Sequence, residues 1–164
     1  MEILVSMPGR LRWNDREVRC ALGPGGIKAH KKEGDGATPA GLFPLRRVLY
    51  RPDRLATPNT RLPLSPIRPN DGWCDDPGDP RYNTQVEKPF EASHETLWRK
   101  DGLYDLLVVL GYNDDPPIPN LGSAIFIHVA KPGYAPTEGC VALGLADLQA
   151  LVETCDESAV LKVG

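Results

Sequence analysis

Short apolar stretches, many of them alternating with polar residues, occur throughout the chain. Alternation with a period of two is typical of strands with one buried face, and short β-branched apolar runs are typical of buried strands. The strands predicted in this way are Ile3–Met7, Arg10–Trp13, Glu17–Ala21, Arg46–Tyr50, Leu103–Tyr112, Ala124–Ala130 and Ala159–Val163. Asn14 and Asp15 favour a turn between the second and third strands, which predicts a hairpin. We expect Leu106–Leu110 and Ala124–Ala130 to form the central pair.

One segment, Ala146–Thr154, is predicted to be a helix, because Leu148, Leu151 and Val152 recur at helical spacing. Ser93 has the chemistry of an N-cap and predicts a second, short helix over His94–Arg99. The elements together predict a mostly β fold. We expect a twisted β-sandwich or a partly closed barrel with one or two peripheral helices.

Composition indicates an ordinary folded protein. The chain has 164 residues, of which 41% are hydrophobic and 25% charged, so we expect one domain over residues 1–164. The net charge of −3 gives no support for nucleic-acid binding, and no apolar run is long enough to span a bilayer. The 17 prolines and 16 glycines favour a loop-rich β architecture, with a Pro-rich loop region at about 51–89.

The N-terminal segment lacks the basic and apolar regions of a secretory signal peptide. This leaves a cytoplasmic protein, a trimmed mature form or another export route open. The four cysteines form no CxxC motif and have no disulfide-dense spacing. For Cys20 and Cys155 we expect packing in the core.

His128 interrupts a predicted buried strand, and Cys140 follows twelve positions later, after a loop rich in Gly and Pro. A thiol near an imidazole is the minimum for a cysteine nucleophile, because the imidazole can accept the thiol proton. Backbone N–H groups at Gly139 and Cys140 could stabilise an oxyanion. Spacing alone leaves open that both side chains are ordinary core residues.

A local signature favours catalysis. His128 followed by Thr-Glu-Gly-Cys-Val at Thr137–Val141, together with an upstream block at Gly36–Leu45 that contains Thr-Pro-Ala-Gly-Leu-Phe, resembles the L,D-transpeptidase (YkuD-like) family. The family pattern has Ser/Thr-His-Gly-Cys, an aliphatic residue and commonly Arg. Here Glu138 replaces the second His and Ala142 replaces the Arg. The loop between His128 and Cys140 is also shorter than is usual in the family.

The resemblance implies that Cys140 attacks peptidoglycan stem peptides and forms an acyl-enzyme. It implies that His128 is the general base and that the backbone carbonyl of Val129 orients its imidazole. Transfer of the acyl group to a second stem would be L,D-transpeptidation. Its hydrolysis would be L,D-carboxypeptidation, and a non-catalytic muropeptide-binding domain is a third possibility. No cofactor or metal is expected, a monomer is assumed, and the family implies a periplasmic or cell-wall location.

Several polar and aromatic residues are candidates for substrate contacts, although Trp73 could equally anchor its loop to the core and His94 could be an ordinary surface histidine. His94 could also supply a second imidazole in the cleft. The substrate-binding residues predicted are Trp73, Asp75, Asn83, His94, Tyr134, Thr137 and Glu138. A metal hydrolase built on Cys74, His94 and His128 matches no recognised ligand spacing.

Overall fold

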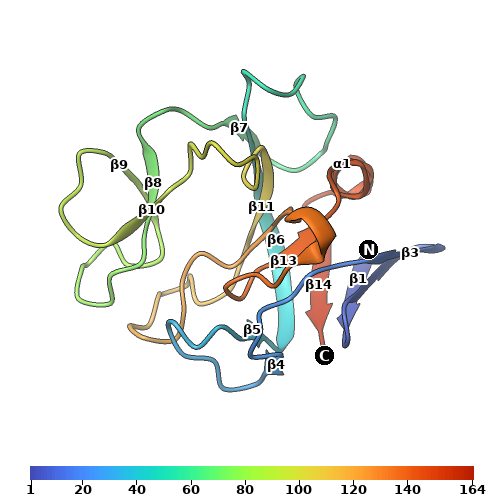
Figure 1. The fold of residues 1–164 in the computed structure, drawn as a ribbon, viewed down its shortest axis with the longest axis horizontal. Helices are drawn as coiled ribbons and strands as arrows, with labels where there is room; N and C mark the ends of the chain where they lie inside the picture. The colour runs from blue at the N-terminus through green and yellow to red at the C-terminus, as the bar shows by residue number, and fades with distance from the viewer.

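The computed structural model describes residues 1–164 and contains one large sheet of nine strands (Figure 1). Its eight-strand path is β13 (Val141–Leu143), β12 (Phe126–Val129), β11 (Leu106–Leu110), β6 (Gly41–Tyr50), β14 (Val160–Val163), β1 (Glu2–Ser6), β2 (Arg10–Trp13) and β3 (Arg16–Arg19). The ninth strand, β7 (Leu64–Pro66), pairs with β6. The predicted hairpin β2–β3 and the predicted central pair β11–β12 are both confirmed.

The two ends of the sheet approach each other. Ala21, just after β3, forms a bridge with Ala142 in β13, and the two backbone N···O distances are 2.8 and 2.9 Å. The sheet is therefore a nearly closed barrel, and the predicted mostly β, barrel-like class is confirmed. Closure pairs backbone groups that an open sheet edge would leave unpaired.

Alternation along the central strands divides the apolar residues between two cores. Leu106 and Val108 of β11 belong to a core of 25 residues inside the barrel, whereas Leu107 belongs to an 11-residue core on the outer face. The one α-helix, α1 (Leu145–Thr154), buries Leu148 and other apolar side chains in the larger core, as its periodicity predicts. A single 3-10 turn, η1 (Pro132–Tyr134), lies between β12 and β13.

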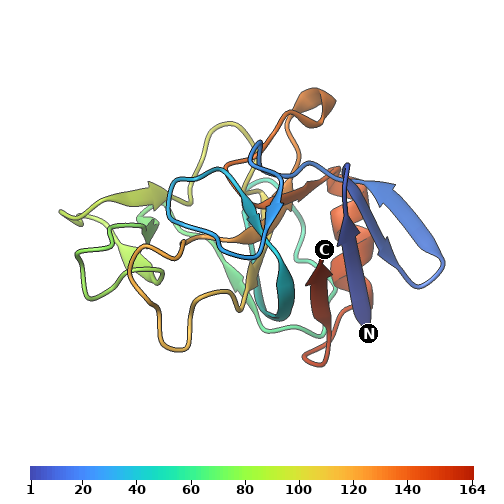
Figure 2. The same ribbon diagram turned by 90° about the horizontal axis from the view of Figure 1, so that it is seen from below.

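The region at 51–89, predicted as a long loop, contains β7 and two strands of a second sheet. This sheet has the order β10 (His94–Thr96), β8 (Asp71–Cys74) and β9 (Gln85–Glu87). It lies at the end of the molecule opposite the β2–β3 hairpin (Figures 1 and 2). Trp73 of β8 packs edge-on against Phe126, with ring centroids 5.0 Å apart. The small sheet is therefore fixed to the outer core by an aromatic contact.

The helix predicted over His94–Arg99 is wrong, because His94–Thr96 forms β10 and pairs with β8. A helix of six residues gains few backbone hydrogen bonds, so a strand partner readily overrides a single capping signal. A further two-stranded sheet joins β4 (Ile27–Lys28) to β5 (Thr38–Pro39). No helix in the structure combines the length and the apolar character needed to cross a membrane.

Candidate active site

The pairing of β12 with β13 places His128 and Cys140 on one face of the sheet. The two strands are parallel, and His128 lies opposite Ala142. Side chains two residues apart on a strand share a face, so Cys140 lies on the same side as Ala142 and His128. The backbone N–H of Phe126 donates to Cys140 Sγ at 3.3 Å, which fixes the sulfur beside β12.

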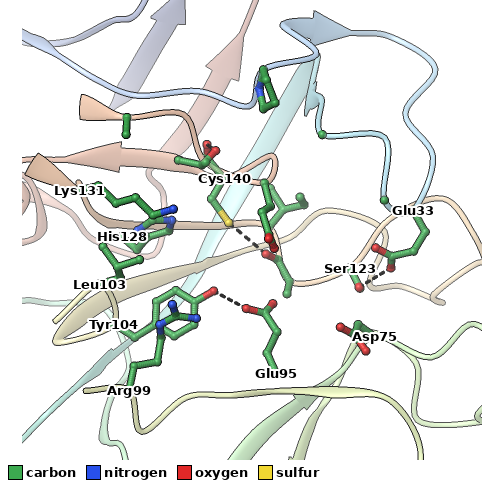
Figure 3. A pocket seen from close by; sticks show the side chains of 18 residues that line it. Glu33, Asp75, Glu95, Arg99, Leu103, Tyr104, Ser123, His128, Lys131 and Cys140 are labelled. Carbon is green, nitrogen blue, oxygen red and sulfur yellow. Dashed lines mark hydrogen bonds between the residues drawn. The ribbon is translucent and has the colours of Figure 1, made fainter. Parts of the chain in front are cut away.

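A cavity of about 470 Å³ opens on this face, and His128 and Cys140 both line it (Figure 3). We call it the Cys140 cavity. Its walls come from the loop between β4 and β5, from the small sheet with the segment that follows it, and from the chain around β12 and η1. The fold therefore brings the predicted nucleophile and base to one cavity.

The thiol of Cys140 is buried and hydrogen-bonded. Sγ donates to the carbonyl oxygen of Ala124 at 3.1 Å and accepts from the N–H of Phe126. Burial, reinforced by the negative charges of Glu95 and Glu138, raises the pKa of Cys140 to about 12. The sulfur is therefore protonated at neutral pH and requires a base to become a nucleophile.

The imidazole of His128 has the protonation state of such a base. Nδ1 lies 2.8 Å from the carbonyl oxygen of Val129, which can only accept, so Nδ1 carries the proton and Nε2 keeps a free lone pair. Tyr104 packs edge-on against the ring, with centroids 5.4 Å apart. Burial lowers the pKa of His128 to about 4, so the ring is neutral at physiological pH.

The backbone donors predicted at Gly139 and Cys140 are not equally available. The N–H of Gly139 donates to Thr137 Oγ1 at 3.1 Å, and that hydroxyl donates to the carbonyl of Cys140 at 2.6 Å. The N–H of Cys140 makes no hydrogen bond within the protein. Gly139 has φ of 133°, and a Cβ there would lie 2.7 Å from the carbonyl oxygen of Ala37. Gly139 and Thr137 therefore shape the turn, and Cys140 retains the free donor.

Trp73 and Asn83, predicted to contact substrate, are buried structural residues that do not line the cavity. The indole N–H of Trp73 donates to Asn83 Oδ1 at 3.0 Å, because a buried indole needs an acceptor. The same oxygen accepts the N–H of Ala124 at 3.0 Å. Ala124 carries the carbonyl that holds the Cys140 thiol, so Asn83 supports the site through the backbone.

His94 and Tyr134, also predicted to contact substrate, do not line the Cys140 cavity. The ring of His94 packs against Phe90, and strand alternation turns its neighbour Glu95 into the cavity instead. The ring of Tyr134 lies under the guanidinium of Arg19, 4.7 Å from its centroid, and lines a different cavity.

Asp75, Thr137 and Glu138 are the predicted substrate-binding residues that do line the Cys140 cavity. Asp75 Oδ1 is buried and has no hydrogen-bond partner within the protein. A buried carboxylate oxygen without a donor is unfavourable. Asp75 is therefore suited to accept a hydrogen bond from a bound molecule.

Sequence reasoning missed four charged residues that line the same cavity, namely Glu33, Glu95, Arg99 and Lys131. Period-two alternation would have indicated Glu95 if the segment had been interpreted as a strand. Glu33 lies in a Gly-rich turn that carries no signal of its own. Its position is fixed by distant donors, since Ser123 Oγ and the hydroxyl of Tyr82 both bond its Oε1.

Charge is divided across the Cys140 cavity. In Figure 3, Arg99 and Lys131 lie on the side of His128, whereas Glu33 and Asp75 lie on the other side. The sulfur of Cys140 lies between these two groups. The cavity therefore presents cations and carboxylates to different parts of a molecule bound at the thiol.

The residues considered for a metal site do not come together. Cys74 and His94 are cross-strand neighbours in the small sheet, whereas His128 is on β12 of the large sheet. No group of three or more His, Cys, Asp or Glu side chains is placed to hold a metal ion.

Comparison with known proteins identifies the family. Residues 2–163 match the family model of the L,D-transpeptidase catalytic domain, YkuD. The chain belongs to the L,D-transpeptidase catalytic domain family. Among solved structures it is similar to the helical cell shape determining protein Pgp2 (K307A mutant) from Campylobacter jejuni, with 15% identity and a TM-score of 0.49. The alignment covers 99% of this chain and 46% of that one, so the chain spans about half the length of this relative. A search of curated proteins found no match.

The departures of this L,D-transpeptidase domain from the family pattern have a structural setting. Ala142, where an arginine is common, is fully buried, and its backbone makes the bridge to Ala21 that closes the barrel. Glu138 is exposed at the cavity and adds negative charge near Cys140 where the pattern has a histidine. The carboxylate of Glu138 therefore contributes to the raised pKa of Cys140.

We expect Glu95→Gln to accelerate alkylation of Cys140 by iodoacetamide several-fold at pH 8. Loss of the neighbouring negative charge favours the thiolate and lowers the pKa of Cys140, and the amide oxygen keeps an acceptor for the hydroxyl of Tyr104. The rate is followed at the Cys140 peptide by mass spectrometry. Glu91→Gln, an exposed change outside the cavity, is the matched control. Equal rates in all three proteins would contradict this electrostatic effect.

Proposed function

We propose that this domain is a peptidoglycan L,D-transpeptidase that uses Cys140 as its nucleophile. The observation that carries the proposal is the pairing, in one cavity, of a buried thiol with a neutral imidazole whose Nε2 is free to accept a proton. Membership of a family that acts on peptidoglycan supports the substrate class. The family also supports a periplasmic or cell-wall location.

Acylation follows from the positions of the groups. His128 Nε2 accepts the proton of Cys140 as the sulfur attacks the carbonyl carbon of the L-centred residue that precedes a terminal D-residue. The oxyanion of the tetrahedral intermediate accepts a hydrogen bond from the free N–H of Cys140. The C–N bond then breaks, and the imidazolium gives its proton to the departing amine of the D-residue. The product is a thioester on Cys140.

Deacylation runs through the same groups. An amine of a second stem attacks the thioester, His128 accepts its proton, and the C–S bond breaks. The sulfur leaves as a thiolate and recovers a proton from the imidazolium. Attack by water in place of the amine would give L,D-carboxypeptidation.

The charge distribution of the cavity supports a substrate that carries both positive and negative groups. A diaminopimelate stem carries an ammonium group, which the carboxylates of Glu33, Asp75 and Glu95 could bind. It also carries carboxylates, which the cationic groups of Arg99 and Lys131 could bind. The unpartnered Asp75 Oδ1 supports an ammonium contact in particular.

The test is product analysis with the purified protein and a diaminopimelate-containing disaccharide tetrapeptide. We expect a cross-linked dimer by mass spectrometry, and no product from Cys140→Ala. The matched control is Cys155→Ala, which removes a buried thiol from the barrel core, away from the cavity, and should retain product formation.

Other products would change the assignment. Tripeptide and free D-alanine without dimer would identify an L,D-carboxypeptidase. Absence of both product and a covalent carbapenem adduct at Cys140 would leave a non-catalytic muropeptide-binding domain. Product formation by Cys140→Ala would show that the nucleophile is another residue.

A further inference from the structure

A second cavity, of about 400 Å³, lies beside the Cys140 cavity and contains two arginines. It is lined by the turn between β1 and β2, by the segment from Arg19 to Gly23, and by Tyr134 and Pro136. We call it the Arg10 cavity. It has no role in the chemistry described above.

Arg10 and Arg19 lie directly opposite each other in the β2–β3 ladder, and both line this cavity. Neither has a carboxylate within 4.0 Å, although the chain carries more carboxylates than Lys and Arg side chains together. Like charges at directly opposed strand positions are destabilising. The pair is therefore an unfavourable arrangement that an anion between the two guanidinium groups would relieve.

Both arginines are exposed, and they differ in their contacts within the protein. The guanidinium of Arg19 lies over the ring of Tyr134 and donates to the carbonyl oxygen of Gly133 at 3.4 Å. Arg10 makes no side-chain hydrogen bond, ion pair or aromatic contact within the protein. One guanidinium held beside Tyr134 and one without a partner can together donate to an oxyanion.

The two cavities share a wall. Thr137 N–H donates to the carbonyl oxygen of Leu22 at 3.0 Å and joins the two segments that form this wall. Tyr134 and Pro136 face the Arg10 cavity, whereas Ala135 and Thr137 face the Cys140 cavity. A chain molecule that is bound at Cys140 therefore has the Arg10 cavity next to it.

We propose that the Arg10 cavity binds carboxylate groups of the peptidoglycan stem peptides and so holds the polymer beside the Cys140 cavity. The substrate class in this inference rests on the proposed function. The shared chemistry is recognition of an oxyanion by two guanidinium groups, which a phosphate polymer of the wall could also supply. The polymer assigned to Cys140 carries carboxylates along its length, and this favours the carboxylate.

The experiment measures binding of soluble glycan strands that carry uncross-linked tetrapeptides. The full chain carries Cys140→Ala, so that no turnover occurs. On this background, Arg10→Gln with Arg19→Gln is compared with Arg12→Gln with Arg16→Gln. The second pair removes the same charge from the same hairpin but does not line the Arg10 cavity. Calorimetry gives the affinities, and thermal melting checks that each variant is folded.

We expect Arg10→Gln with Arg19→Gln to weaken binding by about tenfold or more, as loss of charge-assisted hydrogen bonds does. The control pair should change the affinity by less than about twofold, the scale of a screened surface charge. Amidation of the carboxylates on the glycan strands should weaken binding to the parent protein, which carries Cys140→Ala alone. The effect should be larger than for the protein that also carries Arg10→Gln and Arg19→Gln. Arg10→Gln alone should not lower the melting temperature, because it removes a like-charge pair.

Equal loss of affinity in both double variants would overturn the proposal in favour of general charge attraction. Equal sensitivity of parent and variant to amidation would also overturn it. Stronger binding of a poly(glycerol phosphate) probe than of the strands would overturn the assignment to carboxylates. Failure of the proposed reaction would be seen in the product analysis and leaves these affinities unchanged, because no measurement here includes turnover.

Discussion

Replacing His128 with asparagine is expected to slow acylation of Cys140 by about 10²- to 10⁴-fold, the usual contribution of a general base. The thiol is protonated at neutral pH because burial raises the pKa of Cys140 to about 12. Without the lone pair of His128 Nε2, attack depends on the small thiolate fraction. Formation of a covalent carbapenem adduct, followed by intact mass, measures the rate.

The pH profile separates this mechanism from a preformed ion pair. With pKa lowered to about 4, His128 loses its base function only below that pH, so the wild-type rate should rise through about pH 4 and then stay level. In His128→Asn the rate should instead keep rising with pH as the thiolate fraction grows toward a pKa of about 12. His30→Asn, at an exposed position, should match the wild type. A variant at position 128 that retains half the rate would contradict the role of the imidazole.

Replacing Asn83 with alanine is expected to lower the free energy of unfolding by about 3 kcal/mol or more, because several buried groups lose their partners at once. The indole N–H of Trp73 and the N–H of Ala124 both depend on Asn83 Oδ1. Its amide also donates to the carbonyl oxygens of Tyr112 and Asn113. Urea denaturation measures the loss.

The same substitution should slow Cys140 acylation, because Ala124 presents the carbonyl that holds the thiol. Asn83 has φ of 58°, which asparagine tolerates better than alanine. Asn83→Asp separates the loss of hydrogen bonds from the backbone effect of alanine. Aspartate keeps one acceptor oxygen but places a carboxylate oxygen against the carbonyl oxygens of Tyr112 and Asn113. Asn70→Ala, at an exposed site, is the control. An unchanged denaturation midpoint in Asn83→Ala would contradict the structural role assigned to this residue.

Local patterns predicted much of the fold. The hairpin at Asn14 and Asp15, the helix α1 and the central pair β11–β12 follow from turn chemistry and periodicity, which act within a few residues. The helix predicted at His94–Arg99 was wrong, because its strand partner β8 lies about twenty residues away and leaves no local signal. For the same reason local signals predict a loop at 51–89, where the structure has β7, β8 and β9.

The sequence by itself determined the mostly β class, the family and the His128–Cys140 pair, since these depend on periodicity and on a short motif. Only the tertiary structure decided which side chains share the cavity, because strand pairing brings Glu33, Glu95 and Arg99 together from distant segments. It also decided that Trp73 and Asn83 are buried outside this cavity and bonded to each other, since a buried polar group takes whichever partner packing places beside it. Burial, which sets the protonation states of Cys140 and His128, is a property of the packed fold and is absent from the motif.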